Sequence, residues 1–546
     1  MPSSGRWQIY SVKRLTERKQ RMEAQLYFGG PIWTMASPTP AQALLVQDGI
    51  IQKVGDREIL SAACPQARPI PLEGRTLVPG FLDAHSHFLA CAHAQLQCSV
   101  GDAATVEQLL EKIRTYLQGH PVPAGQWVLV RDYDPALLPG GRGPDRWALD
   151  RATVDHPVVL QHRSGHVGVL NSLALERMGI HGETTDPPGG HIGKDGREPN
   201  GYLEETAFLE VLRRLPSPSL EELLAACDRA QNLYASYGIT TAQEGMLVQE
   251  MVPLYQALCQ GQRLKLDVVG YASWEEAEGI YRTLAAHTGR YLGRFKLGGY
   301  KIFLDGSPQS KTAWLRSPYL DGSNGYPILL DSQVREALSQ ALREGRQLLA
   351  HCNGDAAAQQ FLDALEAVRC QNPHAPSIRP VMVHAQLVGL DQLPRLANLG
   401  VIPSFFPAHI YHWGELHLQN LGIQRASRLS PAASAEALGL PYTFHQDSPV
   451  LPPDLPEVLW CAVNRLTRVG RLLGEMERIS PLQALQAVTR NTAYQYFEED
   501  AKGTLAPGKR ADLVILEQNP LELPPHRLRE LRVSETIKDG QVIWRR

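Results

Sequence analysis

The feature that most limits how this chain can fold is a series of short apolar segments that alternate with helix-length amphipathic ones. Buried strands separated by helices are typical of parallel βα units. Eight such units would complete a barrel of the TIM type. We therefore predict an α/β fold, a (β/α)₈ barrel, with strands at Leu77–His85, Gly238–Glu244, Leu264–Tyr271, Gly298–Leu304, Gln347–His351, Arg379–His384, Val401–Phe405 and Pro441–His445.

The first of these segments ends in two histidines, His85 and His87, separated by one residue. Side chains alternate along a strand, so the two imidazoles would point to the same face and could hold one ion together. A His-x-His pair also arises by chance, so its position matters. Barrel enzymes carry functional residues at the carboxyl ends of their strands, and later strands should therefore end in ligands too.

Three later segments meet this expectation. The fifth segment ends in His351, the sixth ends in His384, and Asp447 follows the eighth. Taken singly, each of these residues is at least as well explained by a structural role. Their occurrence at several strand ends favours a metal centre. Imidazole and carboxylate groups suit zinc, provided that one position stays open for water.

Both ends of the chain contain short strand-like segments that cannot bury a core alone. Asp48-Gly49 and Asp539-Gly540 each lie between apolar runs, which indicates two hairpins. We predict one small composite β-sandwich built from residues 24–75 and 499–546. Residues 1–23 are polar and basic, and we expect a disordered leader, with Met22 as an alternative start.

The interval between the first two predicted strands is too long for a simple crossover connection. We predict that residues 99–236 form an inserted cap subdomain. The barrel would then comprise residues 76–98, with the first strand, and residues 237–498. The stretch at 182–201 is rich in Gly, Pro and Asp and is expected to be a loop that could order over the substrate.

Composition favours a small-molecule partner. The chain has 546 residues, of which 43% are hydrophobic, and a formal net charge of −3, which gives no bulk attraction for nucleic acid or an anionic membrane. No apolar run is long enough to span a bilayer, and residues 1–21 lack the apolar core of a secretory signal. The cysteines show no Cys-x-x-Cys spacing, which indicates reduced thiols. We expect a cytoplasmic protein, and a homo-oligomer is left open.

From about residue 24 onward, the chain resembles the metal-dependent amidohydrolase superfamily, and within it the YtcJ-like branch (amidohydrolase family 3). The motifs that carry the resemblance are Val78–His87, His166–Ser172, Lys301–Ser307, His351–Asp355, Gln446–Pro449 and Gly503–Leu516. Together they are specific for the branch, but they say little about the substrate.

The resemblance implies a centre of one or two divalent metal ions, most often zinc, whose ligands are His85, His87, His351, His384 and Asp447. Members with two metals place a carboxylated lysine at the end of the fourth strand, here Lys301. The alternative for Lys301 is a buried ion pair, for example with Asp305. The metal would lower the pKa of bound water, and Asp447 would take the water's proton and pass it to the departing nitrogen.

Other residues are assigned from a shared motif or from their position after a predicted strand. His166, in a motif that the branch shares, could bind the substrate carbonyl or the developing oxyanion, with a loop-anchoring role as the alternative. Gln309 and Arg316, after the fourth strand, could line the pocket. After the seventh strand we expect a substrate pocket wall, or ordinary aromatic packing beneath the cap, formed by Phe405, His409, His412 and Trp413.

The sequence thus predicts a hydrolase of a carbon–nitrogen bond other than a peptide bond. Its substrate would be an amide, N-acyl or N-formyl small molecule with an apolar group. The first alternative is a deaminase, or an esterase or lactonase, on the same metal site. The second is a non-catalytic scaffold with an amidohydrolase fold, which the intact set of ligands argues against.

Overall fold

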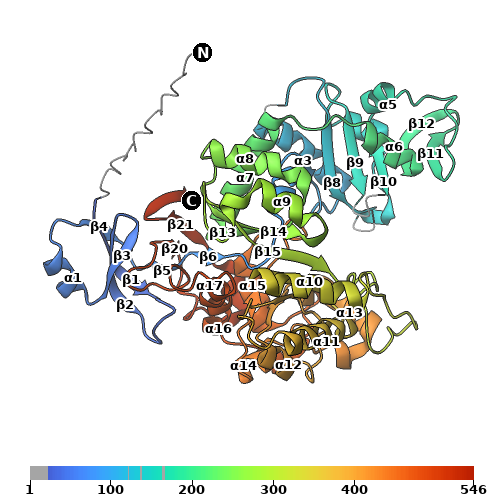
Figure 1. Cartoon of the computed structure of the whole chain (residues 1–546). Helices are drawn as coiled ribbons and strands as arrows, with labels where there is room; N and C mark the ends of the chain where they lie inside the picture. Colours follow the sequence, from blue (N-terminus) through green and yellow to red (C-terminus); the bar gives the residue numbers. More distant parts are fainter. Residues whose placement is uncertain (1–22, 121, 136–137, 163–165) are drawn as a thin grey trace, which may run out of the picture.

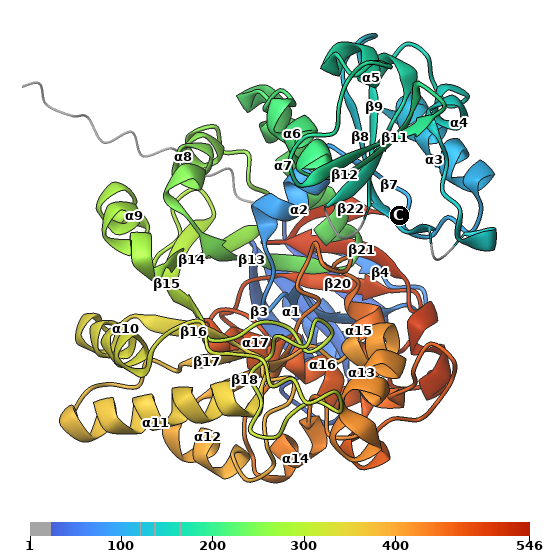
Figure 2. The same cartoon turned by 90° about the vertical axis from the view of Figure 1, so that its right-hand side faces the viewer.

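The computed structural model of the chain describes residues 23–120, 122–135, 138–162 and 166–546. Residues 1–22 of the predicted leader lie outside this range. The centre of the molecule is a sheet of eight parallel strands arranged in chain order (Figures 1 and 2). These strands are β6 (Phe81–Leu82), β13 (Ile239–Leu247), β14 (Asp267–Ser273), β15 (Phe295–Phe303), β16 (Gln347–Cys352), β17 (Val381–His384), β18 (Ile402–Phe405) and β19 (Thr443–Phe444). Each overlaps a predicted segment, so the α/β assignment is confirmed.

Helices connect the strands and surround the outer face of the sheet (Figure 2). The first of them, α7, begins with a capping box in which Ser219 and Glu222 each bind the other's backbone N–H. The helices along the sheet are α7 (Leu220–Ser236), α8 (Val252–Gln260), α9 (Ala277–Thr283), α10 (Asp331–Glu344), α11 (Asp355–Gln371), α12 (Leu393–Leu399), α13 (His409–Ala426) and α14 (Ala432–Ala437).

The sheet curls until its first and last strands approach each other. His85 follows β6 and Asp447 follows β19, and their side chains lie 3.5 Å apart. Among the described residues, no strand ladder joins β6 to β19, so closure of the barrel is not confirmed. The segment containing α17 (Arg490–Gln495) connects the two edges: the Leu82 N–H donates to the Val488 carbonyl, and the Thr443 hydroxyl donates to Gln495 Oε1.

The first predicted strand is divided between two sheets, which corrects the single strand expected at Leu77–His85. β5 (Thr76–Pro79) pairs antiparallel with β20 (Leu513–Leu516), whereas β6 pairs with β13. The division falls at Gly80, where a Cβ atom would lie 2.6 Å from the side chain of Thr240. Glycine therefore allows the chain to pass from one sheet to the other at this point.

The two ends of the chain form one eight-stranded sheet, as their shared strand patterns predicted. β1 (Gln25–Ile32) lies between β5 and β2 (Ala41–Gln47), and the two hairpins have their turns at Asp48-Gly49 and Asp539-Gly540. The other members are β3 (Ile50–Gly55), β4 (Arg68–Pro71), β20, β21 (Val533–Lys538) and β22 (Gln541–Arg545). These strands are hydrogen-bonded into one continuous sheet, and the predicted two-layer sandwich is not confirmed.

A separate six-stranded sheet occupies residues 98–205, at one end of the molecule (Figures 1 and 2). Its strands are β7 (Cys98–Ser99), β8 (Val128–Tyr133), β9 (Val158–His162), β10 (Val167–Leu170), β11 (Gly190–Asp195) and β12 (Glu198–Glu205). The stretch at 182–201, predicted to be a loop, contains β11 and the first half of β12, which form a hairpin, so that prediction is wrong in part. The domain boundaries at 98/99 and 236/237 stay predictions.

Buried charges connect the C-terminal segment to the parallel sheet. Lys538 Nζ lies 2.6 Å from carboxylate oxygens of both Asp267 and Asp512. Lys502 Nζ lies 2.7 Å from Asp267 and 2.6 Å from Glu498. Each of these side chains is at most 8% exposed, so the carboxylates and ammonium groups must compensate one another.

Within the described residues, no helix is both long and apolar enough to cross a membrane. All eight cysteines are free.

Candidate metal centre

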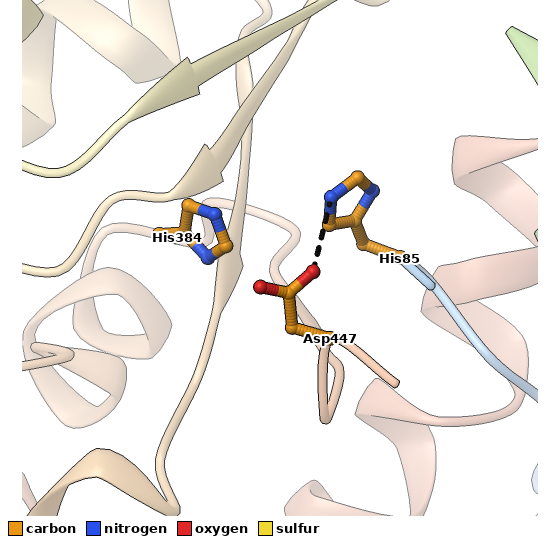
Figure 3. A group of neighbouring side chains, drawn as sticks. All are labelled: His85, His384 and Asp447. Carbon is orange, nitrogen blue, oxygen red and sulfur yellow. Dashed lines mark ion pairs between the residues drawn. The ribbon is translucent and has the colours of Figure 1, made fainter. Parts of the chain in front are cut away.

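The structure brings His85, His384 and Asp447 together at the carboxyl ends of the parallel strands (Figure 3). Their candidate ligand atoms all lie within 4.8 Å of one another. Asp447 Oδ1 is 3.5 Å from His85 Nε2 and equally far from His87 Nε2. Two ligands at about 2.1 Å from a tetrahedral zinc ion would be about 3.4 Å apart, so these separations suit ligands of one ion.

His351 joins the group through His384. In β16 and β17, His351 Nδ1 lies 3.1 Å from His384 Nε2, and their ring centroids are 4.6 Å apart. All four histidines and the aspartate that the sequence singled out therefore meet at one edge of the sheet. Their roles as ligands stay predictions.

The protonation of His85 is fixed by Gln243, which no sequence motif indicated. Gln243 Nε2 donates to the Ala84 carbonyl at 2.7 Å, so its amide oxygen must face His85. That oxygen lies 2.5 Å from His85 Nδ1 and can only accept. Nδ1 therefore carries the proton, and the lone pair of Nε2 is directed to the side of Asp447, as a metal ligand requires.

Glu244, the next residue of β13, has the corresponding position beside His87. Glu244 Oε1 lies 3.9 Å from His87 Nδ1 and accepts no hydrogen bond within the described residues. Glu244 Oε2 accepts hydrogen bonds from the Leu89 N–H and the Tyr255 hydroxyl. Burial raises the pKa of Glu244, and the nearby His87 partly offsets this. Consecutive residues of one strand thus lie behind both histidines of the His-x-His pair.

Asp447 remains ionised although it is enclosed. Burial alone would raise its pKa, but the imidazoles of His87, His384 and His85 hold it well below the usual range for aspartate. Asp447 Oδ1 is buried and accepts no hydrogen bond within the described residues. A buried carboxylate oxygen without a hydrogen-bond partner, surrounded by imidazoles, has the donor chemistry that a divalent cation needs. The residues present therefore fit a metal ion.

Three imidazoles of the centre, those of His85, His351 and His384, have lowered pKa values that favour the neutral form. Burial, followed by the charge of Lys301, lowers the pKa of His351 to about 4. Burial also holds the pKa of His85 and His384 well below 6.5. Neutral imidazole is the form that binds a metal, so no proton has to leave these rings when an ion enters near pH 7.

Lys301 lies inside the same group. Its Nζ atom is 3.3 Å from His85 Nε2, and the side chain is 1% exposed. Burial lowers the pKa of Lys301 to about 7, against an opposing effect of Asp447. The alternative partner, Asp305, accepts hydrogen bonds from the backbone N–H groups of Asn353, Gly354 and Trp314 instead. Bridging two metals stays a prediction for Lys301.

Two residues of the centre have left-handed backbone conformations. The φ angles are 70° at His384 and 56° at Asp447, and Ala385 follows His384 with φ of 43°. Such conformations are unfavourable for non-glycine residues and are concentrated at functional sites. Here they turn the chain at the ends of β17 and β19, where both side chains enter the centre.

His445 was quoted from the sequence only as the end of the eighth strand, and it belongs to the same group of rings. Its Nε2 lies 3.1 Å from His384 Nδ1, and its Nδ1 lies 2.9 Å from the Ser404 hydroxyl. The side chain is fully buried, and burial lowers its pKa to about 3. Its contacts position His384. A histidine at a predicted strand end was the signal that could have identified it.

His166 lies in the six-stranded sheet, beside β10. Its side chain is more than half exposed, and Nδ1 is 3.0 Å from Glu205 Oε2 at the end of β12. This contact suits the anchoring role that was the alternative to catalysis. The catalytic role of His166 stays a prediction.

The segment after β18 places Phe406, rather than Phe405, beside the imidazoles. Phe405 is fully buried and packs near Tyr442, with ring centroids 6.1 Å apart. The Phe406 ring is 5.2 Å from that of His445 and 4.6 Å from that of His409. Phe405 is the last residue of β18 and Phe406 follows it, and a substrate role for Phe405 stays a prediction.

The other predicted pocket residues of this segment lie in α13. His409 is buried, its Nδ1 is 3.2 Å from His417 Nε2, and its ring is 4.5 Å from that of Trp413. His412 Nε2 lies 3.2 Å from Glu457 Oε2, and Arg468 donates to its Nδ1. Both nitrogens of His412 are thus already engaged. Contact of these residues with a substrate stays a prediction.

Gln309 and Arg316 have different surroundings. Gln309 is half-buried, and its amide oxygen accepts no hydrogen bond within the described residues. Arg316 forms paired hydrogen bonds with Asp391 and contacts Asp355. Arg316, Asp355 and Asp391 line a cavity of about 360 Å³, and none of the predicted metal ligands lines it. Substrate roles for Gln309 and Arg316 stay predictions.

Comparisons with known proteins agree with this geometry. Residues 69–544 match a family model described as the amidohydrolase family. The chain is 30% identical over 538 residues to N-substituted formamide deformylase of Arthrobacter pascens, covering 93% of this chain and 95% of that protein. It is 25% identical over 542 residues to the putative amidohydrolase YtcJ of Bacillus subtilis (strain 168), covering 95% and 99% respectively. A metal-dependent hydrolase from Pyrococcus furiosus, described as uncharacterized, matches with a TM-score of 0.72 and 25% identity over 91% of this chain and all of that structure.

Proposed function

Because the chain belongs to the amidohydrolase family, we propose that it hydrolyses the carbon–nitrogen bond of an N-substituted formamide or a closely related N-acyl amide. The observation that carries this proposal is the convergence of His85, His384 and Asp447 beside a buried lysine, in a family of metal-dependent hydrolases. The formyl group is favoured because the relative from Arthrobacter pascens, similar over 95% of its length, is named for deformylation.

The proposed architecture is a closed (β/α)₈ barrel formed by residues 76–98 and 237–498. Residues 99–236 would be the cap, and residues 24–75 and 499–546 the composite terminal unit. The approach of His85 to Asp447 across the first and last strands supports closure.

One or two divalent ions, with zinc as the leading candidate, would be held by His85, His87, His351, His384 and Asp447. Such an ion polarises a carbonyl and lowers the pKa of water towards neutrality. The lowered pKa of Lys301, about 7, supports carboxylation, because the neutral amine is the form that adds carbon dioxide. A carboxylated Lys301 would be a further ligand.

Asp447 is the proposed acid and base. As a carboxylate it can accept a proton from the attacking water, and its position between His85 and His87 keeps it in one orientation. After attack on the formyl carbon, Asp447 would deliver that proton to the departing nitrogen, releasing formate and an amine.

The test is a screen of N-formyl, N-acyl and carbamoyl compounds with the zinc-loaded protein and its Asp447→Asn variant. We expect formamides to give the highest kcat/KM. Loss of a general acid and base costs roughly 10²–10⁴-fold, so Asp447→Asn should lower kcat by at least 100-fold. Near-normal turnover by this variant would refute the role of Asp447, and a screen in which no N-formyl or N-acyl compound is hydrolysed would refute the proposed reaction.

A further inference from the structure

A small cavity lies beside Lys301, at the carboxyl ends of β13, β14 and β15. Its volume is about 100 Å³. The residues around it are mostly apolar: Met246, Ser273, Trp274, Glu275, Lys301, Ile302, Phe303, Ile328 and Leu329. One of these residues, Lys301, also belongs to the predicted metal centre.

Phe303 connects this cavity to the metal centre. It is the last residue of β15, and its ring centroid is 5.0 Å from that of His351 in the neighbouring strand. Lys301 Nζ also lies 5.0 Å from the centre of the Phe303 ring. Phe303 and Lys301 thus line the cavity and also lie beside imidazoles of the metal centre, His351 and His85 respectively.

Few polar groups surround the cavity, and the indole N–H of Trp274 already has a hydrogen-bond partner elsewhere. The Trp274 indole N–H donates to Gln340 Oε1 at 2.9 Å, so the cavity need not supply a partner for it. Ile302 and Leu329 are buried, whereas Ile328 is 50% exposed. The Ile328 N–H donates to the Leu304 carbonyl, which fixes the backbone of this segment next to β15. Ile328 is thus an apolar side chain held in place but left uncovered.

From these contacts we propose that the cavity receives the apolar N-substituent of the substrate, and that this substituent is a short alkyl chain. The inference rests on the proposed function and specifies its substrate. An apolar cavity of about 150 Å³ binds benzene, so a smaller cavity should accept a short chain in preference to an aromatic ring. The exposed face of Ile328 would be covered when the chain enters.

The test compares N-methyl-, N-butyl- and N-benzylformamide with the zinc-loaded protein. N-butylformamide should have the highest kcat/KM, about 10-fold or more above N-methylformamide, because one methylene in an apolar pocket is already worth about 10-fold. Ile328→Asp should remove most of the kcat/KM advantage of N-butylformamide over N-methylformamide, because it places a charged group in an apolar cavity. Trp274→Ala should enlarge the cavity and raise kcat/KM for N-benzylformamide relative to that for N-butylformamide.

Ile59→Asp is the matched control, because Ile59 is 67% exposed on α1 (Arg57–Ala63), a helix next to the terminal sheet. Ile59→Asp should leave kcat/KM unchanged for all three substrates. A second measurement does not require turnover: saturation-transfer NMR should show contact between the butyl protons and the metal-free protein, reduced in Ile328→Asp.

The outcomes distinguish the two proposals. If no formamide is hydrolysed but the butyl chain binds in an Ile328-dependent manner, the reaction is wrong and the cavity inference stands. If formamides are hydrolysed at rates that depend neither on the N-substituent nor on the Ile328→Asp change, the cavity inference is overturned and the proposed reaction stands.

Discussion

Replacing Gln243 with leucine tests how the metal centre is organised. Gln243 is fully buried and makes three hydrogen bonds: with His85 Nδ1 at 2.5 Å, the Ala84 carbonyl at 2.7 Å and the Tyr496 hydroxyl at 3.0 Å. Leucine has a similar size but removes all three. His85 would then lose the acceptor that fixes its tautomer and ring orientation.

The expected magnitudes follow from these contacts. Each lost hydrogen bond costs about 1 kcal/mol, so Gln243→Leu should lower the free energy of unfolding by about 3 kcal/mol. Loss of a partner that orients a metal-bound histidine weakens metal binding by about 10–100-fold. This corresponds to roughly 1.4–2.8 kcal/mol of binding free energy.

Gln231→Leu supplies the control. Gln231 is a buried residue of α7 that also makes three hydrogen bonds: its amide oxygen accepts from the Lys265 and Leu266 N–H groups, and its nitrogen donates to the Arg263 carbonyl. Urea unfolding of the metal-free proteins should show a similar decrease in the free energy of unfolding for both variants. Competition titration with a zinc chelator should show weaker binding only for Gln243→Leu. Equal zinc affinity in the two variants would refute the positioning role of Gln243.

Two further predictions concern Lys301 and the buried charges. Native mass spectrometry of the metal-loaded protein should show an added carbon dioxide that Lys301→Met lacks; an unmodified, fully metal-loaded and active protein would contradict the bridging role. Burial alone would raise the pKa of Glu498, but Lys502 and Lys296 lower it to about 2. A carboxyl group with a lowered folded-state pKa stabilises the fold above its ordinary value of 4.5, and this contribution disappears as the pH falls towards 2. The metal-free Glu498→Gln variant should therefore have a lower free energy of unfolding at pH 7, measured by urea titration. This free energy should fall less between about pH 4.5 and 2 than in the original protein. An equal fall in the two proteins would contradict the prediction.

The parallel strands could be predicted because their information is local. Most are short segments rich in apolar residues, and the positions of His351 and His384 at strand ends required no knowledge of distant contacts. The convergence of His85 and His87 was also predicted, although for an incomplete reason. β6 ends at Leu82, and His87 is already the residue before α2 (Phe88–Ala94), yet both Nε2 atoms lie 3.5 Å from Asp447 Oδ1.

Other features depend on contacts between distant parts of the chain. The break at Gly80 exists because β5 pairs with β20, more than 430 residues later, and nothing in the Leu77–His85 run indicates that partner. Gln243 is an ordinary polar residue within an apolar strand until its distance to His85 is known. The β11–β12 hairpin did have a local signal, Asp195-Gly196, but the surrounding Gly and Pro residues favoured a loop.

The metal content of the protein purified without a chelator tests the proposed metal centre. We predict at least one zinc ion per chain, retained during dialysis, and its loss when His85 and His384 are both replaced with alanine. The matched double variant should be His156→Ala with His374→Ala, two histidines outside the centre, and it should keep its zinc. A metal-free chain that cannot be reconstituted with zinc, or full zinc in the His85 and His384 double variant, would contradict the central claim.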